Sequence, residues 1–211
     1  AVIASSYPFA RIVSKVNRLL GHDTENQLRV LLYHDIAPAE MELFEKQLRW
    51  LSRRWKFVSP AIFEEMMSGE RPIVGRNVLL TFDDGFLSNK LVAEKILAPM
   101  GIKAIFFVIA DFPDISGTFK AHQFIANNIV PGTETNAYPE HMVNMCWNDV
   151  EYLIKHGHTI GSHTRTHARL SLINEWDALS QEIVSSAEKL ETRLGIEVHH
   201  FAYTFGNIGS I

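Results

Sequence analysis

The stretch NVLLTFDDG, residues 77–85, is an apolar run that ends in two adjacent carboxylates and a glycine. Its composition predicts a buried strand. A carboxylate at the end of such a strand is costly to remove from water unless it is paired, hydrogen-bonded or bound to a cation. We therefore expect a partner beside Asp83 and Asp84. Gly85 permits the sharp turn that would keep both side chains near the strand end.

Further strands and helices are predicted on both sides of this stretch. Apolar runs predict strands at residues 28–35, 103–110, 159–163 and 199–206. Apolar spacing and terminal signals predict helices over about 40–54, 60–69, 86–100, 148–156 and 176–194. Ser59 is the expected N-cap of one helix, and Asn148 with Glu151 resembles a capping box at another. Residues 111–145 are expected to form a long loop.

Strands that alternate with helices predict an α/β fold with parallel strands, arranged in layers or as a barrel. In such folds the functional groups gather at the carboxyl ends of the strands. Asp83, Asp84, His163 and the segment from Tyr203 all lie at the carboxyl ends of predicted strands. They are therefore expected to meet in space, although they are far apart in the sequence.

Length and composition narrow the class of protein. The 211 residues, of which 46% are hydrophobic and 21% charged, fit one globular domain. The formal net charge of -4 argues against a nucleic-acid binder that neutralises phosphates. No apolar run approaches the roughly 20 residues of a transmembrane helix. The first residues lack the order of an intact signal peptide, so the expected location is either cytoplasmic or exported. The single Cys146 excludes an internal disulfide.

GSHTRTH, residues 161–167, supplies two histidines that are candidate metal ligands. His163 and His167 would share one face of a helix, and a tight turn would also bring them together. With Asp83 or Asp84 they would offer three ligands to one divalent ion and leave positions for water and substrate. The other aspartate would take a proton from the water. Zinc is the first expectation, and cobalt or nickel would suit the same ligands.

Other interpretations fit the same residues. Asp-Asp-Gly is commonly a plain turn, and two histidines four apart are often solvated or structural. Two aspartates after a strand also suit a magnesium site for phosphoryl transfer. That chemistry would call for a glycine-rich phosphate loop, and the sequence contains no G-x-x-x-x-G-K-[ST] motif.

The motifs together resemble those of the polysaccharide deacetylase family of carbohydrate esterases, the NodB homology domain. TFDDG at 81–85 resembles the first motif, HTRTH at 163–167 the second and FAYTFG at 201–206 the third. LLYHDI at 31–36 is similar to members that act on N-acetylated exopolysaccharides. The resemblance covers residues 28–206 and implies a distorted (β/α) barrel with about seven strands, incomplete at its carboxyl-terminal end. Residues 1–27 would be an extension and 28–211 the catalytic domain.

The resemblance also implies an activity and a role for each matching residue. The expected reaction is metal-dependent removal of acetyl groups from an N-acetylated polysaccharide or oligosaccharide. Hydrolysis of a formamide or cyclic amide, or an inactive glycan-binding protein, are the alternatives. In this interpretation Asp83 is the base, and the metal ligands are Asp84, His163 and His167. The backbone N–H of Phe205 would hold the oxyanion, and substrate contacts are assigned to Tyr203 and His34.

The sequence departs from the family pattern in three places. Ala202 stands where many relatives have an arginine that orients the catalytic aspartate, so Arg165 becomes the candidate for that task. Thr204 replaces a common proline, which leaves the backbone before Phe205 less restricted. The histidine that acts as general acid in relatives is expected beyond Gly206, so the general acid is unassigned.

Overall fold

A five-stranded parallel sheet organises residues 26–205, the part of the chain that the computed structural model describes. Four strands follow the order β1-β3-β4-β5, and β2 also pairs with β3. This is fewer than the seven expected, and the described strands form no closed barrel. Most of the predicted extension, residues 1–25 of 1–27, falls outside the described residues. The strands are β1 (Gln27–Tyr33), β2 (Lys56–Phe57), β3 (Arg76–Phe82), β4 (Ala104–Val108) and β5 (Thr159–Ser162).

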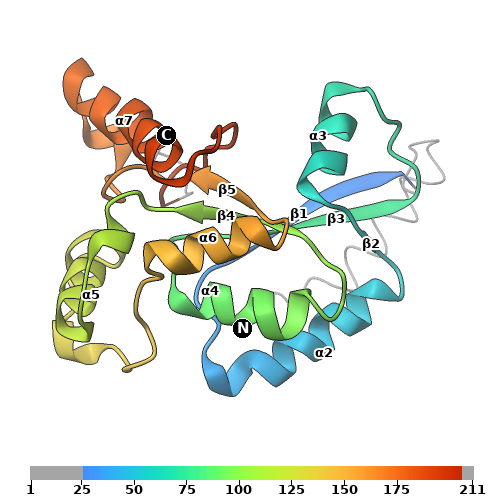
Figure 1. Ribbon diagram of the computed structural model, residues 1–211, viewed down its shortest axis with the longest axis horizontal. Coiled ribbons are helices and arrows are strands. Elements are labelled where there is room, and N and C mark those ends of the chain that lie inside the picture. Colours follow the sequence, from blue (N-terminus) through green and yellow to red (C-terminus); the bar gives the residue numbers. More distant parts are fainter. Residues whose placement is uncertain (1–25, 206–211) are drawn as a thin grey trace, which may run out of the picture.

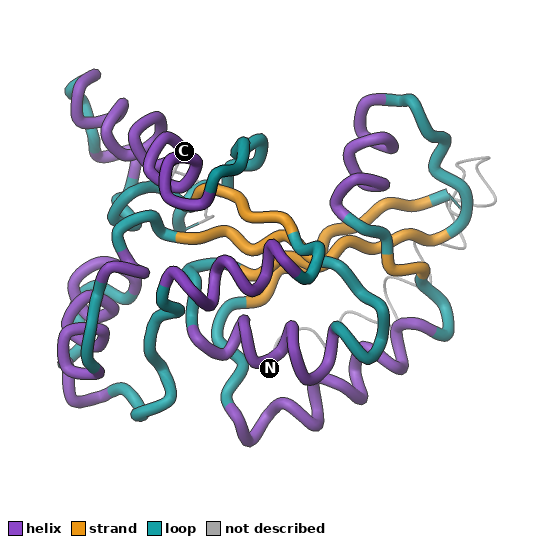
Figure 2. Tube along the Cα trace, viewed as in Figure 1, coloured by secondary structure: helices purple, strands orange, loops and turns teal. Residues whose placement is uncertain are grey.

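Helices cover both faces of the sheet (Figures 1 and 2). On one face lie α2, α4, α6 and α7, whose Leu190 joins the same apolar cluster, and on the other face lies α3. The α-helices are α2 (Met41–Ser52), α3 (Pro60–Ser68), α4 (Leu87–Val92), α5 (Thr118–Phe124), α6 (Trp147–Lys155) and α7 (Trp176–Leu194). Two π-helical turns, η2 (Ala93–Leu97) and η4 (Ile125–Ile129), continue α4 and α5. Four short 3-10 turns are η1 (Pro38–Glu40), η3 (Phe112–Asp114), η5 (Thr135–Ala137) and η6 (Leu170–Leu172).

The alternation of side chains along β3 and β4 divides the core into two. Leu80 and Phe82 point to the face that α2, α4 and α6 cover, where Phe82 stacks on Phe106 with 4.9 Å between ring centroids. Leu79 and Ile105 point the other way and pack against residues around α3. Both faces of these strands are therefore buried, as the continuous apolar runs predict.

The capping predicted from the sequence is confirmed at the start of α3 and is wrong at the start of α6. The Ser59 side chain accepts the N–H of Ile62, as its position before Pro60 predicts. At α6 the capping box is formed by Cys146 and Asp149 and not by Asn148 and Glu151 as predicted. The helix begins earlier, and the Asp149 carboxylate accepts the N–H of Cys146 at 3.0 Å.

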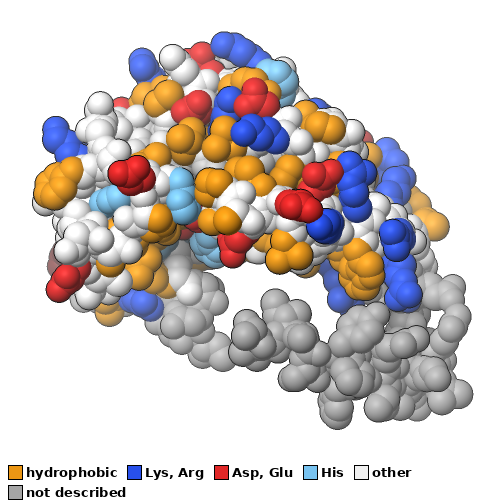
Figure 3. Space-filling view, turned by 90° about the horizontal axis from the view of Figure 1, so that it is seen from below, with side chains coloured by type: hydrophobic (Ala, Val, Ile, Leu, Met, Phe, Trp, Pro, Cys, Tyr) orange, Lys and Arg blue, Asp and Glu red, His pale blue; other side chains and the backbone are white. Residues whose placement is uncertain are grey.

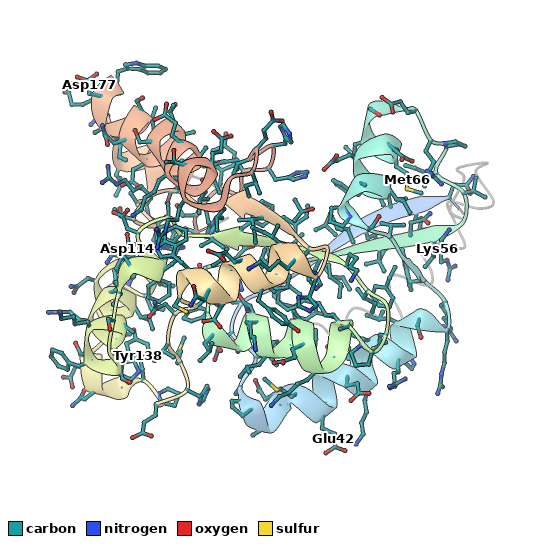
Figure 4. The ribbon with its side chains drawn as sticks, in the orientation of Figure 1. Glu42, Lys56, Met66, Asp114, Tyr138 and Asp177 are labelled. Carbon is teal, nitrogen blue, oxygen red and sulfur yellow. The ribbon has the colours of Figure 1, made fainter. Side chains whose placement is uncertain are left out.

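Two local predictions are corrected by the structure. Residues 111–145 are not one long loop, because α5 and η4 lie within them and cover a third apolar cluster that contains Phe112 and Ile125. Figure 4 labels Asp114 and Tyr138 on this side of the molecule. The strand predicted at 199–206 is reduced to a single bridge between Phe201 and Ser162, and residue 206 lies outside the described range.

The surface seen in Figure 3 mixes acidic, basic and hydrophobic side chains, and neither charge sign dominates this face. None of the described helices is long and apolar enough to cross a membrane.

Candidate active site

The predicted site residues line one cavity of about 490 Å³. The segments that follow β1, β3 and β5 at their carboxyl ends build it. His34 follows β1, Asp83 and Asp84 follow β3, and His163 follows β5. The sheet topology thus brings together residues that are far apart in the sequence. The cavity includes every predicted site residue, namely His34, Asp83, Asp84, His163, His167, Tyr203 and Phe205.

A left-handed turn directs the two aspartates into this cavity. Asp84 has φ 73° and Gly85 has φ 89°. A non-glycine residue in this conformation costs roughly 1–2 kcal/mol. The N–H of Asp83 donates to the Tyr33 carbonyl at 2.9 Å, and the N–H of Met145 donates to the Gly85 carbonyl at 2.9 Å. These bonds hold the turn, and both carboxylates are almost completely buried.

The histidine motif is a tight turn and not a helix. Thr164 and His167 both have positive φ, 63° and 66°. The N–H of His167 donates to the Thr164 hydroxyl at 2.9 Å, which closes the turn. The two imidazole centroids are consequently 5.1 Å apart, and both rings are buried.

Three atoms of this site converge as metal ligands do. One carboxylate oxygen of Asp84 lies 3.4 Å from the Nε2 atoms of both His163 and His167. The Nδ1 atoms lie 2.9 Å from the carbonyl oxygens of Ala202 and Asn128. Because a carbonyl only accepts, each Nδ1 carries the hydrogen and each Nε2 presents its lone pair to Asp84.

This arrangement fits a divalent metal ion. The converging carboxylate oxygen, Asp84 Oδ1, is buried and has no hydrogen-bond partner among the described residues. Two lone pairs facing a buried carboxylate are unfavourable unless a cation lies between them. Two imidazoles and one carboxylate are a common ligand set for zinc and similar ions, and they leave a coordination position open.

Burial and charge shift the pKa values of the site in different directions. Burial raises the pKa of Asp83 to about 6, although His163 and His34 would oppose the rise when protonated. For His163 burial lowers the pKa, but the adjacent carboxylates of Asp84 and Asp83 outweigh it, and the net pKa is raised. Burial leaves the pKa of His167 lowered. Asp83 is therefore a stronger base than an exposed aspartate.

The third motif supports the histidines through its backbone and through Thr204. The Ala202 carbonyl orients His163, as described above. The Thr204 hydroxyl donates to the Ala168 carbonyl at 2.6 Å, so this threonine ties the third motif to the histidine turn. The ring of Phe205 lies 4.7 Å from the His167 ring and 4.1 Å from the Arg169 guanidinium, measured to the ring centroids.

The sequence did not predict several residues of the cavity. Asp35 follows His34, and one of its oxygens is buried with no hydrogen-bond partner in the part of the chain that the structure describes, while the other lies 3.6 Å from Nε2 of His141. Residues 129, 130 and 142 reach the cavity from the segment that was expected to be a loop. Arg165 does not take the expected role beside Asp83, because its guanidinium bonds to Asp111 and Gln181.

Comparison with known proteins identifies the family of this chain. The family model described as polysaccharide deacetylase matches residues 71–210. The chain belongs to this family. Its members are hydrolases that act on carbon–nitrogen bonds outside peptides.

Individual relatives agree with this assignment. YxkH of Bacillus subtilis (strain 168), which carries the name of a polysaccharide deacetylase, is 29% identical over 89 residues. The match covers 39% of this chain and only 32% of YxkH. The structure of IcaB from Ammonifex degensii aligns with a TM-score of 0.65 and 24% identity, over 88% of this chain and 78% of that one. The deacetylase PplD of Streptococcus pyogenes, solved with acetate, aligns with a TM-score of 0.64 and 21% identity, over 89% and 78%. These two likenesses concern the fold.

Proposed function

We propose that this polysaccharide deacetylase family member removes acetyl groups from an N-acetylated polysaccharide or oligosaccharide, with zinc as the first candidate metal. The observation that carries the proposal is the convergence of Asp84, His163 and His167 on one point, with the buried Asp83 carboxylate beside them. Acetate, which PplD holds in its solved structure, is the product that hydrolysis of an acetamide would release.

Asp84, His163 and His167 would hold the ion. When bound, it supplies a Lewis acid that polarises the acetamide carbonyl and makes a nearby water molecule more acidic. Asp83 takes the proton from that water, for which its raised pKa suits it. The N–H of Phe205 is the proposed donor to the oxyanion that forms as water attacks.

The leaving sugar amine needs a proton, and His34 is the proposed donor. His34 lines the cavity and lies close enough to Asp83 for its charge to affect the Asp83 pKa. Among the described residues that line the cavity, it is the histidine outside the ligand cluster. The general acid expected beyond residue 206 falls outside the described residues, and His34 is the proposed candidate within them.

The cavity mouth suits a sugar ring. Among the residues that line the cavity, Tyr203 is 49% exposed and Leu32 is 51% exposed. An exposed aromatic ring can cover the C–H face of a pyranose, while the buried polar groups meet the acetamide. The cavity volume lies within the roughly 300–1,000 Å³ that is typical of small-molecule sites.

Acetate release tests the proposal. The protein is loaded with zinc and incubated with N-acetylglucosamine oligomers, beside a sample treated with a chelator. We expect acetate from the loaded protein and none from the chelated one. Release that continues without metal would refute the metal-dependent reaction. Hydrolysis of a formamide or a cyclic amide, with the oligomers untouched, would keep the site and refute the substrate.

A further inference from the structure

The turn that carries both histidines needs support from outside itself. Two of its five residues, Thr164 and His167, adopt the left-handed conformation without being glycine. Such residues persist only where the surrounding structure holds them. The carbonyls of Thr164 and Arg165 accept the N–H groups of Ala110 and Asp111, which fixes one side of the turn.

Glu182, on α7, fixes the other side. One of its carboxylate oxygens accepts the N–H of Thr166 at 2.9 Å and the N–H of Arg165 at 3.1 Å. The other oxygen accepts the Thr166 hydroxyl at 2.7 Å. The main-chain carbonyl of Glu182 also receives the Arg165 N–H at 3.0 Å. A carboxylate that accepts three bonds from one short segment restricts that segment strongly, because charge-assisted bonds are about twice as strong as neutral ones.

The helix that presents Glu182 is itself tied to the same end of the sheet. One turn further along α7, the Ser186 hydroxyl bonds to the Ser162 hydroxyl at 2.7 Å, and both side chains are buried. Lys189 then bonds to Asp111 at 2.6 Å. These three α7 residues lie on one face of the helix, at intervals of four and three. These bonds fix the position of α7, and with it the position of Glu182, relative to the sheet.

We propose that Glu182 is a positioning residue for the metal site, holding the Arg165–Thr166 segment so that the imidazoles of His163 and His167 stay aimed at Asp84. The inference rests on the metal site of the proposed function. Glu182 does not line the cavity and bonds to neither imidazole. It acts on the segment between the two histidines.

Zinc affinity is the readout that separates positioning from a general effect on stability. Glu182→Gln keeps the size of the side chain but removes its charge and replaces one acceptor oxygen with a donor. Thr166→Val removes only the hydroxyl bond and serves as a milder second variant. Glu188→Gln, on an exposed residue of the same helix, is the matched control. The dissociation constant for zinc is measured by competition with a chromophoric chelator, at a temperature where each metal-free variant is folded by circular dichroism.

We expect Glu182→Gln to raise the zinc dissociation constant by about 10–100-fold, the range typical of residues that orient metal ligands. Thr166→Val should raise it by less, and Glu188→Gln should leave it unchanged. A lower melting temperature with unchanged affinity in Glu182→Gln would refute the positioning role. A parent protein that binds zinc but releases no acetate would refute the proposed activity alone, since the affinity comparison would still stand. A parent that binds no zinc would refute both.

Discussion

The burial of His158 predicts how the free energy of unfolding changes with pH. Its side chain is 5% exposed, and its ring edge meets Phe106 in the core, with 5.2 Å between centroids. The Nδ1 atom accepts the N–H of Ala104 at 3.2 Å, which requires a neutral ring with the hydrogen on Nε2. Burial lowers the pKa of His158 to about 4, and the charges of Lys103 and His156 add to the effect.

The lowered pKa fixes both the sign and the size of the effect. As pH falls through 6.5, the unfolded chain binds a proton at His158, whereas the folded protein does not until about pH 4. The stability present above pH 6.5 is therefore lost as pH falls, and the loss is complete below pH 4. At 1.36 kcal/mol per pH unit the full loss is about 3 kcal/mol, of which about 2 kcal/mol is lost by pH 5.

Urea unfolding of the metal-free protein at pH 7 and pH 5 measures this loss. His158→Asn is the reference, because the amide oxygen can still accept the Ala104 N–H but does not titrate. The variant will be less stable at pH 7, since it leaves a small cavity. Its disadvantage should shrink by about 2 kcal/mol at pH 5. Parallel pH profiles for the two proteins would refute the assignment of a neutral, buried His158.

Three further substitutions test the site. Asp84→Asn should weaken zinc binding by more than the roughly 10–100-fold expected for an orienting residue; calorimetry that shows unchanged affinity would remove Asp84 from the ligand set. His34→Gln should lower kcat by about 10²–10⁴-fold while zinc still binds, and near-normal turnover would rule out His34 as the proton donor. Thr204→Val leaves the Ala168 carbonyl without its 2.6 Å donor. It should cost about 1–3 kcal/mol in urea unfolding, so an unchanged midpoint would show that this bond stabilises nothing.

Local patterns were sufficient to predict the strands and helices that contain long apolar repeats. The runs that became β3 and β4 are continuous because both of their faces are buried, and the helix at 176–194 follows from its regular spacing. Pro113 and Gly117 made the segment 111–145 resemble a loop, whereas α5 and η4 follow Gly117 and bury Ile125. Phe201 was assigned to a strand on composition, but it forms only one bridge.

The site residues were predictable because the chemistry needs recognisable residue types at strand ends. Their orientation was not. The Nδ1 atom of each histidine bonds to a carbonyl 39 residues away in the sequence, and any residue type supplies a carbonyl. Glu182 follows Thr166 by 16 residues and is one of several glutamates, so only the packing of α7 distinguishes it. Arg165 was assigned by proximity in the sequence, and its actual partner, Asp111, follows a different strand.

The central claim is that Asp83 performs the chemistry while Asp84 and the histidines hold the metal. The most direct test measures acetate release and bound zinc together in the parent, in Asp83→Asn and in Asp177→Asn. Asp177 is exposed at the start of α7, far from the sheet (Figure 4). Asp177→Asn therefore makes the same aspartate-to-asparagine change at a position outside the site. We predict that Asp83→Asn loses about 10²–10⁴-fold in rate but keeps its zinc, and that Asp177→Asn matches the parent. Turnover by Asp83→Asn at the parental rate would contradict the account.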